Sequence, residues 1–138
     1  MTQAISIIRD ALQHLRVADS SSALDENDTA DALRALNQMM RTWEVDGISL
    51  GWQDVPNSEA AMPTPLEADE AIGYGLAIRL APRFGLQPDA VTVQMATQGL
   101  GTLRAFVASN LYERCSYDDL PIGNAQRVGG GWRAGFYR

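Results

Sequence analysis

Apolar residues recur at intervals of three and four residues over four stretches of the chain, which is the spacing of one helix face. The pattern predicts helices over residues 2–17, 26–46, 66–81 and 88–114. Their apolar positions, in chain order, are Ile5, Ile8, Leu12 and Leu15; Leu33, Leu36, Met40 and Trp43; Ile72, Leu76 and Leu80; and Val93, Ala96, Leu100, Leu103, Val107 and Leu111. We therefore expect an all-α fold, a bundle of about four helices.

Residues with special roles at helix ends and inside helices refine these boundaries. Thr2 is expected to cap the first helix, and Gly47 fits the position just beyond the second. Pro88 suits the first turn of the fourth helix. Gly73 and Gly75 each weaken the third helix by about 1 kcal/mol relative to alanine, so we expect a close neighbour at that point.

The connections differ in character along the chain. Residues 18–25 are small and polar and predict a loop, and residues 48–52 suggest a short extended piece. Residues 54–65 contain three prolines and no helical period, which predicts a long surface connection between the second and third helices. After Cys115 the helical pattern ends. The chain thus divides into a helical domain, residues 1–114, and an extended C-terminal arm, residues 115–138.

The arm has an unusual composition. No carboxylate follows Asp119, so residues 120–138 carry +3, and subtracting this from the −6 of the whole chain leaves −9 for residues 1–119. Arginine and aromatic side chains are the favoured anchors of protein interfaces, so we expect the arm to fold onto a partner. The expected anchors are Arg127, Trp132, Arg133, Phe136, Tyr137 and Arg138.

Charge and composition exclude several classes of protein. Seventeen acidic residues against eleven arginines and no lysine argue against a general nucleic-acid binder. One cysteine and one histidine exclude an internal disulfide and a Cys/His zinc site within one chain, and we expect no cofactor. No apolar run approaches the roughly 20 residues that span a bilayer, and the N-terminus has no basic region of a signal peptide. We expect a soluble protein made in the cytoplasm.

A catalytic function would depend on Glu67 and Glu70. They lie three residues apart at the start of the predicted third helix, a spacing of about 5–6 Å that a glycoside hydrolase could use. The simpler interpretation is that acidic residues stabilise a helix N-terminus. His14 and Cys115 have no nucleophile or base placed beside them by a motif, so we expect a helix-end histidine and an inert thiol.

Other possible sites also have simpler interpretations. Asp118-Asp119 fits a solvated turn better than a cation site. Gly129–Gly131 lacks the features of a phosphate loop and fits a flexible joint. Met39, Met40 and Trp43 are expected in the core.

Two segments carry a resemblance to a known family. DALRALNQMMRTWEVDGISLGW, residues 31–52, and AIGYGLAIRLAPRFG, residues 71–85, resemble the head-to-tail adaptor proteins of tailed bacteriophages. These are also called packaged-DNA stabilisation or tail accessory proteins. In the first segment the matching pattern is Met39-Met40, Trp43 and Asp46-Gly47. In the second segment it is Leu-Ala, Ala-Pro and Phe-Gly, in that order. The resemblance covers about residues 2–114 and, more loosely, the arm.

The resemblance implies a structural virion protein at the head-to-tail junction. Such a subunit docks beneath the portal ring, in a ring of about twelve copies, and its arm reaches along the portal or a neighbouring subunit. A tail nozzle, hub or stopper protein would attach below, and packaged DNA would pass through without sequence-specific binding. No enzymatic activity, cofactor or membrane contact is expected. Two alternatives remain: a peptidoglycan hydrolase using Glu67 and Glu70, and a small helical DNA-packaging factor.

Overall fold

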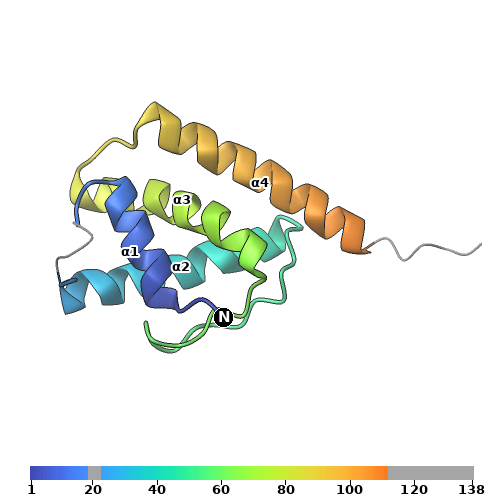
Figure 1. The fold of residues 1–138 in the computed structure, drawn as a ribbon, viewed down its shortest axis with the longest axis horizontal. Coiled ribbons are helices and arrows are strands. Elements are labelled where there is room, and N and C mark those ends of the chain that lie inside the picture. The colour runs from blue at the N-terminus through green and yellow to red at the C-terminus, as the bar shows by residue number, and fades with distance from the viewer. Residues whose placement is uncertain (19–22, 112–138) are drawn as a thin grey trace, which may run out of the picture.

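The computed structural model describes residues 1–18 and 23–111, and these form a layered helical bundle (Figure 1). Its elements are α1 (Ala4–His14), α2 (Glu26–Val45), the short 3-10 turn η1 (Leu66–Ala68), α3 (Asp69–Leu80), a second 3-10 turn η2 (Ala81–Phe84) and α4 (Ala90–Leu111). Helix α3 lies between α4 on one side and the α1–α2 pair on the other. The predicted all-α bundle and its long connection between the second and third helices are confirmed for these residues.

The predicted apolar faces form most of the core. In α1, α2 and α3 every predicted face residue is buried except Ile5 and Leu33, which are half-buried. Met39, Met40 and Trp43 are buried in the core as expected. In α4 the predicted face is correct for Ala96, Leu103 and Val107, which are buried, and wrong for Val93, which is 42% exposed. Leu100 is half-buried, and the side chain of Leu111 lies outside the described part of the chain.

The predicted start of the first helix is wrong, because its cap comes from another part of the chain. Helix α1 begins at Ala4, and Gln3 precedes it without a side-chain cap. The N–H groups of Ala4 and Ile5 donate instead to the carbonyl oxygens of Ala60 and Ser58, at 3.0 and 2.7 Å. A loop backbone thus satisfies donors that a capping side chain normally satisfies.

Thr2 and the other predicted ends are also corrected. The Thr2 hydroxyl donates to the carboxylate of Asp69, which ties the N-terminus to the start of α3. Helix α3 is shorter than predicted, because 3-10 turns flank it, and α4 begins at Ala90 rather than at Pro88. The predicted end of the fourth helix at residue 114 lies outside the described residues. Gly47 occupies the left-handed conformation (φ 86°) beyond α2 that the sequence predicted.

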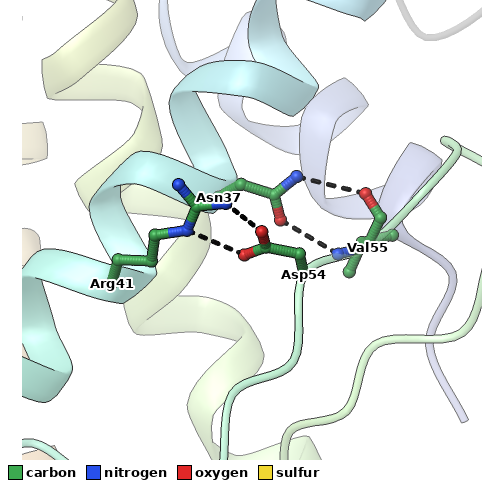
Figure 2. A network of polar contacts seen from close by, with 4 residues as sticks. All are labelled: Asn37, Arg41, Asp54 and Val55. Atoms are coloured by element: carbon green, nitrogen blue, oxygen red, sulfur yellow. Dashed lines mark hydrogen bonds and ion pairs between the residues drawn. The ribbon is translucent and has the colours of Figure 1, made fainter.

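The connection after α2 runs back along that helix and is fastened to it at three levels. The amide of Asn37 both donates to and accepts from the backbone of Val55, at 3.1 and 3.0 Å (Figure 2). One turn further along, the Arg41 guanidinium pairs with both oxygens of Asp54. The Glu44 carboxylate then accepts from the backbone N–H of Trp52 at 2.9 Å. The connection is therefore held in one path.

The expectation that residues 54–65 lie on the surface is confirmed in part. Asp54, Pro56, Asn57, Glu59 and Ala61 are exposed, whereas Val55 and Met62 are buried in the main core. Ile48 and Trp52, which precede this segment, are buried in the same core. Residues 48–52 form no strand; the only bridge among the described residues joins Gln3 to Ala61. The prolines stop the helix, but the apolar residues between them still bury their side chains.

Small residues on α3 and α4 let the helices approach closely. A Cβ on Gly75 would lie 3.0 Å from Cζ2 of Trp43 and 3.3 Å from Sδ of Met39, so the predicted close neighbour of the glycine pair is α2. Gly73 has no such neighbour. The tighter contact was not predicted: a Cβ on Gly99 of α4 would lie 2.7 Å from the Cβ and 3.0 Å from the Cα of Ala71 on α3.

The Gly99 contact predicts a contrast between two substitutions on α4. Gly99→Ala should destabilise the protein by about 1–3 kcal/mol, because the new methyl group pushes α4 away from the α3 backbone. Gly101→Ala, where no atom lies within 4 Å of the new Cβ, should stabilise it by about 0.5–1 kcal/mol through helix propensity. Urea unfolding of the two variants measures the difference. Equal effects would contradict the close helix contact.

The Arg41–Asp54 pair predicts a pH effect on the connection. The hydrogen bonds from Arg41 hold the pKa of Asp54 below its usual value. A carboxylate whose folded-state pKa is lowered contributes stability above its unfolded pKa, and this contribution is lost as the pH falls through the folded pKa. Arg41→Gln should therefore raise the pKa of Asp54 in an NMR titration.

A matched control for this titration is Arg34→Gln. Arg34 pairs with Asp31 at 3.6 Å on the exposed face of α2 and does not contact Asp54. This variant should leave the pKa of Asp54 where it is. A pKa of Asp54 that is insensitive to Arg41 would contradict the arrangement.

Candidate functional site

The six predicted anchors of the C-terminal arm lie outside the described residues. They are Arg127, Trp132, Arg133, Phe136, Tyr137 and Arg138, and their role stays a prediction. The same holds for Cys115, for Asp118-Asp119 and for the glycine run 129–131. The surfaces that the structure does describe belong to the helical domain, where the acidic surplus of the chain is concentrated.

The structure brings the two candidate catalytic carboxylates into one small pocket. Glu67 lies on η1 and Glu70 on the first turn of α3, and both side chains line a pocket of about 200 Å³ facing Gln98 and Thr102 of α4. Both glutamate side chains are exposed to solvent. Pockets that bind small molecules usually have about 300–1,000 Å³. The pocket is thus smaller than most small-molecule sites, although both acids line it.

His14 is the last residue of α1, as expected for a histidine that suits a helix end. Its ring stacks on Tyr74 of α3, with centroids 4.1 Å apart and an angle of 18° between the planes. This contact joins the C-terminal end of α1 to the middle of α3. It gives His14 a packing role in the described part of the chain.

The outer face of α4 is large, exposed and almost uncharged. Arg104 is the only charged residue among the 22 residues of the helix. The exposed face is otherwise built of small or uncharged residues: Ala90, Val91, Val93, Gln94, Thr97, Gln98, Gly101, Thr102, Ala105, Ala108, Ser109 and Asn110. Val91 is 62% exposed. Depletion of charge is a mark of the centre of protein interfaces, and this signal was readable in the sequence.

A groove lies on the other side of the molecule, between α1, the first turns of α2 and the connection at Ser58 and Glu59. It has a volume of about 550 Å³ and is lined by Ile5 and Arg9 of α1 and by Leu33 of α2, among others. Ile5 and Leu33 were predicted as core, and their partial exposure at the edge of the core forms this groove. Sequence periodicity places such residues on the apolar face without showing which of them reach its edge.

Two classes of site find no support in the described part of the chain. No group of three or more histidine, cysteine or acidic side chains lies close enough together there to hold a metal ion. None of the helices in residues 1–18 and 23–111 combines the length and apolar character that crossing a membrane requires. The candidate binding features of the described domain are therefore the exposed face of α4, the groove between α1 and α2, and the small pocket at Glu67 and Glu70.

Comparison with models of protein families gives a match over nearly the whole chain. The model of a protein family described as P22 tail accessory factor matches residues 1–135, which includes the helical domain and nearly all of the arm. A comparison with curated proteins found no match.

Proposed function

The chain belongs to the P22 tail accessory factor family, and from this membership we propose that it is a head-to-tail adaptor docking on the portal ring of its phage. Membership itself assigns the chain to the accessory proteins of a phage tail, a structural role in the virion. The proposal adds the partners and the assembly. Copies of the chain form a ring beneath the portal, extend the DNA channel and present a platform for a tail nozzle, hub or stopper protein.

The observation that carries the proposal is the extent of the family match. It runs through residue 135 and so includes the helical domain together with Arg127, Trp132 and Arg133 of the arm. A family defined over both parts supports the view that domain and arm act together. An arm rich in arginine and aromatic residues suits a docking segment on a separate protein surface.

The surface of the helical domain is compatible with a ring around DNA. Residues 1–114 carry 15 acidic side chains and 8 arginines, a net charge of −7, and a negative channel wall lets the DNA phosphates slide without binding. The nearly uncharged outer face of α4 offers an area that another protein can cover without desolvating charged groups. A ring of about twelve copies would follow the symmetry of the portal beneath which it assembles.

Removal of the arm tests the docking role. A chain ending at Cys115 should keep the helicity of the full protein in circular dichroism, because the core of the described residues comes from residues 4–107. It should lose binding to the portal protein of the same phage in sedimentation. Unchanged binding by this truncated chain would contradict the role of the arm.

A milder variant of the same test keeps the arm in place. In the full chain, Trp132→Ala with Phe136→Ala removes two proposed anchors and should weaken portal binding by more than tenfold, since aromatic anchors often contribute about 2 kcal/mol or more each. Val91→Ala, a truncation on an exposed part of α4, is the matched control for the loss of apolar surface.

A peptidoglycan hydrolase is the second candidate function, and the pocket that holds both Glu67 and Glu70 favours it. It predicts that the protein clears a suspension of peptidoglycan and that Glu67→Gln or Glu70→Gln abolishes this clearing. We expect no clearing by the unaltered protein and unchanged portal binding by both variants. Clearing that disappears with either glutamine would establish the hydrolase.

A further inference from the structure

The groove between α1 and the first turns of α2, the α1–α2 groove, combines an apolar floor with exposed carboxylates. Leu24 and Leu33 line it, and both are half-buried and packed against the core. Glu26 and Glu59 line it too, and both are exposed. Neither carboxylate forms an ion pair with any residue in the part of the chain that the structure describes. The groove therefore suits a ligand that presents apolar surface together with positive charge.

Arg9 favours aromatic groups as the apolar part of that ligand. Its side chain lines the groove, and its Nε is buried without a hydrogen-bond partner among the described residues. A guanidinium in such a place can stack on the face of an aromatic ring. Because Glu26 and Glu59 outnumber Arg9, the charge of the groove is still negative overall. Its volume of about 550 Å³ lies in the range of about 300–1,000 Å³ that is usual for binding sites.

The wall of the groove is held rigidly, so its shape exists before any ligand arrives. The carbonyl of Ser58 accepts from the N–H of Ile5 at 2.7 Å, and that of Ala60 accepts from the N–H of Ala4 at 3.0 Å. These bonds fix the connection at Glu59 against the first turn of α1. A preformed groove loses less conformational entropy on binding than one that must be ordered.

The segment of the chain with the matching chemistry is residues 127–138. It contains no carboxylate side chain, and it holds three arginines and three aromatic residues: Arg127, Arg133 and Arg138, and Trp132, Phe136 and Tyr137. Aromatic rings suit the apolar floor, and guanidinium groups can form bidentate pairs with Glu26 and Glu59.

The chain is long enough to bring this segment back to the groove of its own copy. Helix α4 ends at Leu111, at the opposite end of the domain from the start of α2 (Figure 1). Residues 112–131 can span up to about 65 Å. A domain of about 110 residues has a radius of gyration of about 13 Å and is therefore only roughly 35 Å across. Trp132 and the residues after it can thus reach the groove.

Tethering favours the groove of the same copy over the groove of another copy. A segment joined to its site by a short linker is present there at an effective concentration in the millimolar range, whereas other copies are present at only about 10 μM in a dilute sample. While the subunit is free in solution, its own groove therefore competes for the segment with an advantage of about a hundredfold.

We propose that residues 127–138 dock in the α1–α2 groove of their own copy while the subunit is free, and leave this groove when the subunit docks on portal. The inference rests on the proposed adaptor function, because it adds a regulation to the arm that docks on portal. Groove and portal compete for the same anchors. A groove occupied in about nine of ten free copies lowers the apparent affinity for portal about tenfold.

Photo-crosslinking of the full chain without portal tests the contact. Benzoylphenylalanine, a photoreactive residue, replaces Tyr137 and should join to residues 5–9 or 24–33 of the same chain. The product keeps the mass of one chain, and its yield should be the same from about 1 to about 50 μM protein, because a tethered contact does not depend on concentration. Pairs of joined chains in place of this product, crosslinks confined to other parts of the domain, or no crosslink would overturn the inference.

Charge reversal in the groove supplies the matched variants. Glu26→Arg with Glu59→Arg should lower the yield of the crosslink within one chain about tenfold, because the groove then repels the arginines. Asp46→Arg with Asp89→Arg makes an equal change of charge at exposed positions that do not line the groove, and it should leave the yield unchanged. Equal yields from the two variants would overturn the inference.

Reversal of the arm should rescue the reversed groove. Adding Arg127→Glu and Arg133→Glu to the Glu26→Arg, Glu59→Arg chain restores opposite charges on the two partners, so the yield should return. A variant that merely misfolds could not recover in this way. No recovery would overturn the inference.

Portal binding separates this inference from the proposed function. Without the competing groove, the Glu26→Arg, Glu59→Arg chain should bind portal protein of the same phage about tenfold more tightly than the unaltered chain, a gain that misfolding could not give. Asp46→Arg with Asp89→Arg should bind as the unaltered chain does. Unchanged or weaker binding by the groove variant would overturn the inference and leave the adaptor function standing. Failure of the unaltered chain to bind portal would overturn the adaptor function and with it the release from the groove, whatever the crosslinks show.

Discussion

The close approach of α3 to its neighbours is the constraint on which the rest of the structure depends. On one side Gly99 of α4 leaves no room for a side chain against Ala71, and on the other Gly75 makes room for Trp43 of α2. These contacts make α3 the middle layer of the domain and place α4 outside it. With one face against α3, α4 leaves the other bare, and that face is almost without charge. The close packing of α3 against α4 thus determines which face of α4 is exposed to solvent.

A second constraint comes from the connection between α2 and α3. Asn37 and Arg41 fix its path along α2, and the backbone at Ser58 and Ala60 then caps α1. Three separate parts of the chain therefore share one hydrogen-bonded unit, and the wall of the α1–α2 groove is part of it. Such a unit keeps the groove in one shape.

The helices could be predicted from the sequence, but the contacts between segments far apart in the chain could not. Periodicity located the core faces of α1, α2 and α3, since burial of one side of a helix leaves a local trace. It could not reveal that Thr2 bonds to Asp69, because that pair is 67 positions apart in the chain. Nor could it show that Met62 is buried among prolines or that Gly99, rather than Gly73, meets another helix. For the candidate site, the charge-poor α4 was visible in the composition, whereas the groove arises only when α1, α2 and residues 58–59 come together.

The family assigns the chain to the phage tail, and the adaptor proposal explains why an acidic helical domain should carry a basic, aromatic arm. The most direct test of that proposal is the mass of the protein by light scattering, alone and after mixing with portal protein of the same phage. An adaptor predicts a complex with about one chain per portal chain, as shared ring symmetry requires. A stable monomer in both runs, with the portal mass unchanged, would contradict it.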